Sequence, residues 1–150
     1  IDLLPSTVNI LSEINNIICI KEAVNVQSRF KDLKKIKDNR QEFLLLSGDD
    51  PTFVNFMEYC GDGVISVAAN IIPAKIKELC DLCFLKKFNE AKILNEKYLN
   101  LYELLFTEAS PSPCKFLLEK MSLLENNLRL PLYPLSEKFK EEVYEAYKKI

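Results

Sequence analysis

Three short, largely apolar runs constrain the fold of this chain more than any other feature. They are residues 17–20, 43–46 and 64–67, each four residues long and flanked by polar or turn residues. Runs this short are typical of strands rather than of buried helices. Because their hydrophobicity is nearly continuous rather than alternating, we expect the strands to be covered on both faces, as in a parallel sheet.

Segments with helical periodicity lie before, between and after these runs. Asp2 is expected to cap a first helix that has Pro5 in its first turn, and apolar residues three or four apart indicate helices over 30–36 and 53–59. After the third run the pattern is entirely helical, with helices predicted over 73–85, 91–105, 115–123 and from 136 onward. This order predicts an α/β fold that is mostly helical by residue count.

Composition narrows the possible functions. The 150 residues carry a formal net charge of -2, which provides no electrostatic footprint for nucleic acid or for an anionic membrane. No apolar stretch approaches the ~20 residues that a membrane-spanning helix needs. The chain contains no histidine, which removes Ser-His, Cys-His and His-metal chemistry, and we expect no metal site.

The cysteines predict a reducing environment. There are five, an odd number, and we expect them to be buried free thiols of a cytoplasmic protein. Cys80 and Cys83 have the spacing of a redox or zinc pair. Because no second pair and no preceding strand accompany them, a structural role is the favoured interpretation.

Lys21 is the residue whose position most suggests chemistry. It directly follows the apolar run 17–20, where a surface charge is out of place. Desolvation at such a position disfavours the protonated amine, so that the neutral amine can attack a carbonyl. Glu22 could be an ion-pair partner, but adjacent residues of a strand point to opposite faces. We therefore predict that Lys21 forms a Schiff base.

Polar residues also occur at the carboxyl ends of the other two runs. Ligands of parallel α/β folds bind at the carboxyl ends of the strands. Ser47 and Gly48 follow the second run and are candidates for lining a pocket there, and Ser66 lies in the third run. The next two residues, Asp49 and Asp50, precede Pro51 and are expected to cap the following helix.

Five segments resemble the dihydrodipicolinate synthase family in order and spacing, and the resemblance extends over essentially the whole chain. They are residues 18–23 (ICIKEA), 46–50 (LSGDD), 61–67 (GDGVISV), 112–115 (SPCK) and 130–136 (LPLYPLS). Related aldolases such as N-acetylneuraminate lyase share the lysine, but their sequences differ after it and at the second and third strand ends.

The resemblance implies a (β/α)8 TIM barrel with extra C-terminal helices. Residues 1–70 would form its strands six to eight, and residues 71–150 the last barrel helix and the helical extension. Lys21 would form the Schiff base with pyruvate, and the main-chain carbonyl of Ile65 would face it. The resulting enamine would attack aspartate semialdehyde and the adduct would cyclise, in lysine and diaminopimelate biosynthesis. No cofactor beyond the covalent imine is implied, and the family forms homodimers or homotetramers.

The resemblance covers only the later part of that barrel. The first five strands would precede Ile1, which is not a methionine, so the chain is expected to be a piece of a longer protein. The proton-relay tyrosine, the threonine pair, the carboxylate-binding loop, the acceptor arginine and the lysine feedback site would lie there as well. We therefore expect an inactive fragment that can pair with the missing segment. The alternatives are a non-catalytic remnant with a structural or binding role, and a related aldolase with another acceptor.

Overall fold

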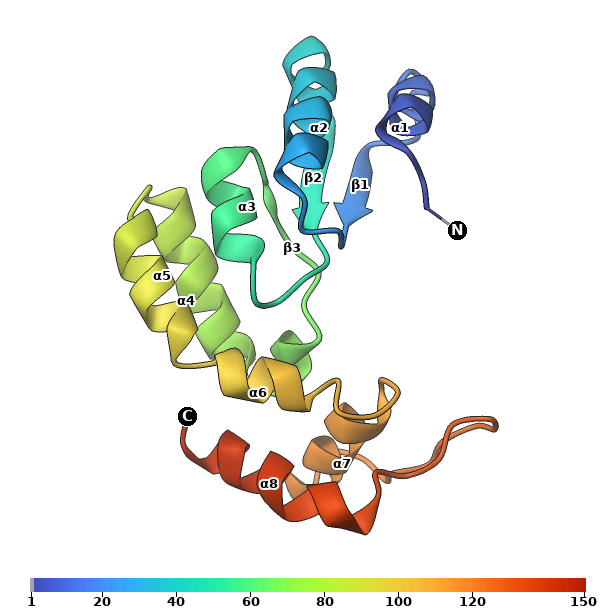
Figure 1. The fold of residues 1–150 in the computed structure, drawn as a ribbon, viewed down its shortest axis with the longest axis vertical. Coiled ribbons are helices and arrows are strands. Elements are labelled where there is room, and N and C mark those ends of the chain that lie inside the picture. The colour runs from blue at the N-terminus through green and yellow to red at the C-terminus, as the bar shows by residue number, and fades with distance from the viewer. Residues whose placement is uncertain (1) are drawn as a thin grey trace.

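The computed structural model describes residues 2–150, in which three parallel strands alternate with helices before an entirely helical C-terminal part (Figure 1). The prediction of a mostly helical α/β fold is confirmed. The elements are α1 (Pro5–Ser12), β1 (Cys19–Glu22), α2 (Gln27–Asn39), β2 (Leu44–Ser47), α3 (Phe53–Tyr59), β3 (Gly63–Val64), the 3-10 helix η1 (Ala68–Asn70), α4 (Pro73–Phe84), α5 (Phe88–Glu96), α6 (Leu99–Leu104), α7 (Ser112–Lys120) and α8 (Glu137–Lys148).

The strands follow one another in chain order, and all of them run parallel. Lys21 of β1 lies opposite Leu46 of β2, and Ser47 of β2 lies opposite both Glu22 and Val64. This register brings the carboxyl ends of the strands to one edge of the sheet. β1 begins two residues later than predicted, so that Lys21 is its third residue rather than the residue after its end.

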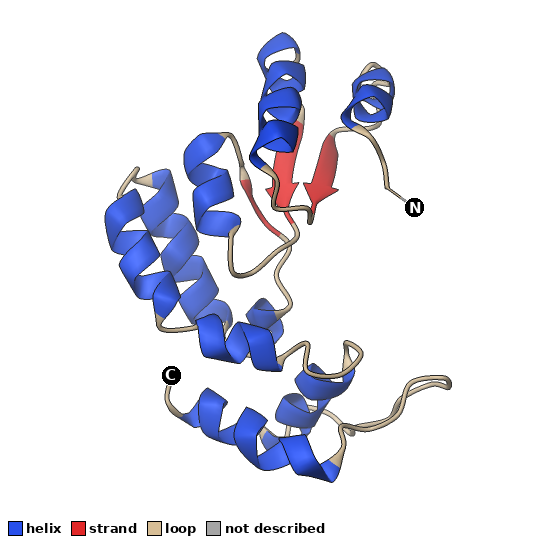
Figure 2. Ribbon diagram, viewed as in Figure 1, coloured by secondary structure: helices blue, strands red, loops and turns tan. Residues whose placement is uncertain are grey.

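Helices α1, α2 and α3 cover one face of the sheet (Figure 2). The helical periodicity predicted this packing, because Phe30, Leu33 and Ile36 are the buried residues of α2. The rings of Phe30 and Phe56 meet edge to face, with their centroids 4.8 Å apart. This core consists of Val8, Phe30, Leu33, Ile36, Phe43, Leu45 and Phe56.

The other face of the sheet is open in the described part of the chain. Cys19 and Lys21 of β1 are exposed, and 39% of Leu44 in β2 is accessible to solvent. Their neighbours Glu22 and Leu45 point the other way and are buried. The expectation that both faces are covered, and that every thiol is buried, is therefore wrong for residues 2–150. The strands carry apolar residues on both faces, but the helices described for residues 2–150 pack against only one of them.

A second, larger core joins α3 to the C-terminal helices. Phe53 and Val54 of α3 pack into it, whereas Phe56 on the other side of the helix belongs to the first core. The single helix predicted over 91–105 is in fact two, α5 and α6, separated by a turn at 97–98. The turn allows Tyr98 and Tyr102 to be almost fully buried together in this core.

Two helix starts show where the sequence prediction was only partly right. Pro5 begins α1 as expected, but Leu4 is the N-cap residue, and the Asp2 carboxylate instead accepts a hydrogen bond from Arg29. Ser136 is the N-cap position of α8, although its hydroxyl donates to the Glu108 carboxylate rather than capping the helix. Of the helices described for residues 2–150, none combines the length and the apolar character that crossing a membrane requires.

Candidate active site

Lys21 lies on the open face of β1, and its side chain runs across Gly48. Residues 44, 46 and 48 share one face because side chains alternate along a strand, and Lys21 is registered opposite Leu46. A Cβ atom built on Gly48 would lie 2.5 Å from Cε and 3.0 Å from Cγ of Lys21. The absence of a side chain at Gly48 therefore creates the space that Lys21 occupies.

Glu22 faces the opposite side of the sheet and pairs with Arg29 rather than with Lys21. Its carboxylate is buried and accepts hydrogen bonds from the main-chain N–H of Val24, at 2.7 Å, and from the Arg29 guanidinium. The hydrogen bond that Arg29 donates to Glu22 is the largest influence on the pKa of Arg29, and it raises that pKa. This pair fixes the loop after β1. Among residues 2–150, no carboxylate forms an ion pair with Lys21.

Ser47 shares the face of Glu22, so its side chain does not line the open face. It is 2% exposed, and its hydroxyl bonds to the main chain of Asp49, accepting from the N–H at 3.2 Å and donating to the carbonyl at 3.3 Å. The main-chain carbonyl of Ser47 accepts from Ile65 N–H, and the next N–H, of Gly48, donates to the Glu22 carbonyl at 2.7 Å. Ser47 thus shapes the turn that presents Gly48.

Ile65 extends the ladder of β3 by one residue and lies at the same edge as Lys21. Its N–H donates to the Ser47 carbonyl at 2.8 Å. The preceding residue on its face, Gly63, lies against the side chain of Leu46, and 48% of Ile65 itself is exposed. Lys21, Gly48 and Ile65 therefore come from three successive strand ends and share the open face at the carboxyl edge.

Asp49 and Asp50 do not cap α3, contrary to the sequence prediction. The N-cap residue is Thr52, without a side-chain cap hydrogen bond, and its hydroxyl donates to the Asp49 carboxylate. Asp50 is buried and turns away from α3: its Oδ2 accepts hydrogen bonds from the N–H groups of Val67, at 3.1 Å, and Ala68, at 3.0 Å. These bonds draw the chain into η1 and explain why β3 is shorter than predicted.

Burial raises the pKa of Asp50, whereas the nearby Ser66 hydroxyl and the hydrogen bonds from the N–H groups of Ala68 and Val67 oppose that rise. No local pattern in the sequence predicts this role of Asp50. Two consecutive aspartates before a proline are typical of a helix start, and nothing local shows that one of them reaches a turn 17 or 18 residues further along the chain.

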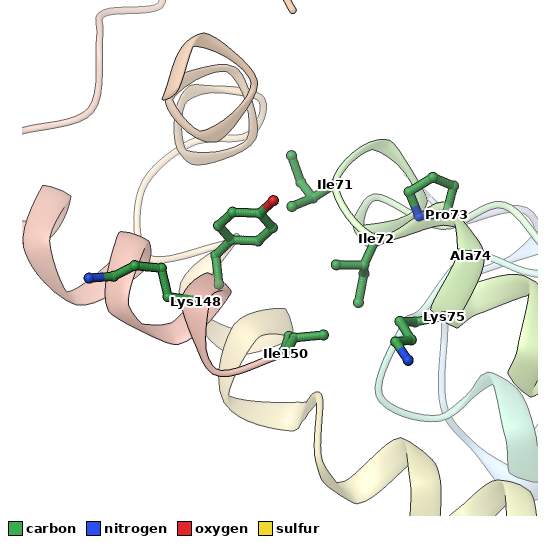
Figure 3. A pocket seen from close by; sticks show the side chains of 8 residues that line it. Ile71, Ile72, Pro73, Ala74, Lys75, Lys148 and Ile150 are labelled. Atoms are coloured by element: carbon green, nitrogen blue, oxygen red, sulfur yellow. The ribbon is translucent and has the colours of Figure 1, made fainter. Parts of the chain in front are cut away.

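An apolar groove of about 400 Å³ lies between the end of α8 and the start of α4, and contains none of the predicted site residues. The side chains of Ile71, Ile72 and Ile150 gather around it, whereas the amine of Lys148 points away (Figure 3). Among residues 2–150 there is no cluster of three or more His, Cys, Asp or Glu side chains placed to hold a metal ion.

Parallel strands in sequential order, helices on one face and a candidate site at the carboxyl edge define part of a β/α-barrel protein. Comparison with known proteins identifies the family of barrel proteins to which the chain belongs. The chain belongs to the Dihydrodipicolinate synthetase family, which it matches over residues 1–150.

The similarity to individual relatives covers nearly all of this chain but only about half of each relative. It is 42% identical to 4-hydroxy-tetrahydrodipicolinate synthase from Buchnera aphidicola subsp. Schizaphis graminum, over 97% of this chain and 49% of the relative. It also resembles the crystal structure of dihydrodipicolinate synthase from Thermotoga maritima, with a TM-score of 0.93 and 34% identity, over 99% of this chain and 51% of the other.

A third relative carries a ligand. The chloride-inhibited dihydrodipicolinate synthase from Acinetobacter baumannii, complexed with pyruvate, has a TM-score of 0.89 and 39% identity, over 99% of this chain and 50% of the other. The chain thus spans about half the length of the relatives that it matches.

Proposed function

We propose that this chain supplies Lys21 as the Schiff-base nucleophile of a synthase that condenses pyruvate with aspartate semialdehyde. The observation that carries the proposal is the position of Lys21: on the open face of β1, over the space left by Gly48, at the edge that also presents Ile65. A family relative crystallised with pyruvate supports the choice of substrate.

In the proposed reaction, the neutral Nζ of Lys21 attacks C2 of pyruvate. The carbinolamine loses water to give the imine, and loss of a proton from C3 gives an enamine. C3 of the enamine then forms a bond to the aldehyde carbon of aspartate semialdehyde, whose oxygen takes up a proton, and the imine at C2 re-forms. The amino group of the aspartate semialdehyde part adds to C2, and the bond from C2 to Nζ of Lys21 breaks, which closes the ring and frees the amine. The Ile65 carbonyl faces the bound pyruvate. Three strands do not close a barrel, so strands that correspond to the other half of the relatives cover the open face and desolvate the amine.

Borohydride trapping tests the proposal. The 150-residue chain is incubated with pyruvate near neutral pH, alone and with the separately produced N-terminal half of the Buchnera relative, and then reduced. The expected product is a single stable adduct, with the mass of one reduced pyruvyl group, on the peptide that contains Lys21. An adduct on Lys31 or Lys115 instead would exclude this assignment, and no adduct in either sample would favour a non-catalytic remnant.

A methyl group at position 48 is expected to impair trapping without unfolding the protein. In Gly48→Ala the new Cβ displaces the end of the Lys21 side chain, which is flexible, so the free energy of unfolding should change by less than about 1 kcal/mol. The trapping rate should fall about tenfold, because the amine leaves its position. Both are measured by timed borohydride quenching and by urea denaturation.

Gly63→Ala provides the matched control for this substitution. Its Cβ would lie 3.5 Å from Cδ2 of Leu46, an ordinary contact on the same face of the sheet. Trapping by this variant should match that of the unsubstituted chain. Equal trapping by Gly48→Ala and Gly63→Ala would show that the space over Gly48 is not needed for the reaction.

A further inference from the structure

A carboxylate in the turn after β2 holds the turn after β3. Oδ2 of Asp50 accepts hydrogen bonds from two consecutive main-chain N–H groups, those of Val67 and Ala68. Hydrogen bonds that involve an ionised acceptor are about twice as strong as neutral ones. The two loops that carry Gly48 and Ile65 are therefore tied together by one buried side chain.

The bonds to Asp50 form one of two anchors that bracket the Ile65 carbonyl. On the upstream side, Ile65 N–H donates to the Ser47 carbonyl at 2.8 Å. On the downstream side, Val67 N–H donates to Asp50, and only Ser66 lies between the two anchored residues. The residues on both sides of the Ile65–Ser66 peptide are therefore held by hydrogen bonds, which limits the backbone positions from which the Ile65 carbonyl can be presented.

The loop that carries Asp50 is itself held from the C-terminal helices. The Pro51 carbonyl accepts a hydrogen bond from Nδ2 of Asn95 in α5, at 3.0 Å, and Oδ1 of Asn95 accepts one from the Tyr102 hydroxyl of α6, also at 3.0 Å. Asn95 and Tyr102 are both buried. The helical extension thus contributes a rigid support for this loop at a distance from the open face.

The arrangement is costly for a purely structural contact. Among residues 2–150, Oδ1 of Asp50 is buried without a hydrogen-bond partner. Burying a carboxylate with one unpaired oxygen destabilises a fold, and a neutral side chain could accept the same two N–H groups at lower cost. A buried polar group of this kind calls for an explanation, and the bracketing of Ile65 supplies one.

We infer that Asp50 is a positioning residue, which through the amides of Val67 and Ala68 holds the Ile65 carbonyl in the direction that pyruvate requires. The inference deepens the proposed function and rests on it for the identity of the ligand. Asp50 does not touch the reacting atoms. Its removal changes the affinity for pyruvate more than the reactivity of the Lys21 amine.

The test compares Asp50→Ala and Asp50→Asn with a matched control, Asp62→Ala. Oδ2 of Asp62 also accepts a main-chain N–H of the sheet, that of Leu45 at 2.8 Å, but at the amino end of β2. Two quantities are measured: the pyruvate concentration that gives half-maximal borohydride trapping, and the hydrogen exchange of the amides of residues 65–68. Trapping is done with the N-terminal half of the Buchnera relative present.

Asp50→Ala should raise the half-maximal pyruvate concentration about tenfold, while the trapping rate at saturating pyruvate changes by less than about threefold. Exchange at Val67 and Ala68 should accelerate. Asp50→Asn keeps a side-chain oxygen that can accept from both amides, so its half-maximal pyruvate concentration should lie within about threefold of the original value. Asp62→Ala should leave it unchanged. The inference would be overturned if a folded Asp50→Ala had the same half-maximal pyruvate concentration as the original protein. It would also be overturned if Asp50→Ala and Asp62→Ala shifted this concentration equally.

If Asp50→Ala does not fold, the positioning role of Asp50 is tested by an acid titration. The titration uses the chain in which Asp49 is replaced by asparagine. Asp50 then remains the carboxyl group of this turn, since the Tyr102 hydroxyl has a pKa raised by burial and does not titrate in acid. The carbonyl carbon resonance of Ile65 should shift in the same step as the amides of Val67 and Ala68. An Ile65 resonance that does not move overturns the inference. If the chain traps no pyruvate, only the proposed function is refuted. The inference about Asp50 is still tested, because the titration does not depend on pyruvate.

Discussion

Replacement of Lys21 by arginine is expected to abolish both pyruvate trapping and synthase turnover in the complete barrel. Arginine preserves the positive charge and the long aliphatic stem, but its guanidinium stays protonated and does not form an imine with a ketone. Because the proposed route passes through a covalent intermediate, no parallel route of similar rate remains. The loss of turnover should be on the order of 10³-fold or more, as for other removed nucleophiles.

The measurement is a coupled assay with pyruvate and aspartate semialdehyde, followed by borohydride reduction and peptide mapping of the same samples. Lys31→Arg is the matched control, since Lys31 is exposed on α2. It should retain both activities. In the 150-residue chain the Lys21 side chain lies on an open face, which has room for arginine, so Lys21→Arg should keep the denaturation midpoint of that chain. Turnover that survives this substitution would exclude Lys21 as the nucleophile.

The fold could be predicted from the sequence wherever local periodicity and packing agree. The apolar spacing of Phe30, Leu33 and Ile36 located α2, and the three short runs located the starts of the parallel strands within two residues. The prediction failed where a tertiary contact decides. β3 ends early because Asp50 binds the amides that follow it, and the helix predicted over 91–105 bends to bury Tyr98 with Tyr102. Neither contact has a local signal.

The candidate site was predictable from strand order and from the resemblance, but not all of its members could be identified equally well. Lys21, Gly48 and Ile65 lie on one face of the sheet, which the alternation of side chains explains once the register is known. Ser47 lies opposite Glu22, on the other face of the sheet from Lys21. Once the register of the strands is known, the alternation of side chains therefore shows that Ser47 and Lys21 do not share a face. The partnership of Glu22 with Arg29 follows from this geometry as well.

The chain of 150 residues on its own is expected to show little or no synthase turnover. Its sheet has only three strands, and β1 and β3 each pair on a single side within the described residues. The open face leaves Lys21 in contact with solvent. A positioned general acid or base alone is worth on the order of 10²–10⁴-fold, and orientation of the substrate can contribute several kcal/mol more. In the proposed reaction we expect both contributions to come from the half of the relatives that this chain does not match.

Addition of the separately produced N-terminal half of the Buchnera relative should restore turnover. The chain matches 49% of that enzyme at 42% identity. Because the resemblance places this match in the later part of the barrel, the edge strands and the open face should find matching surfaces on the N-terminal half. The same coupled assay is applied to the chain, to the N-terminal half, to their mixture and to the intact relative. Activity in the mixture that requires Lys21, and is absent from either half, is the expected outcome. Turnover by the isolated chain near that of the intact relative would show that the facing half of the barrel is not needed for catalysis.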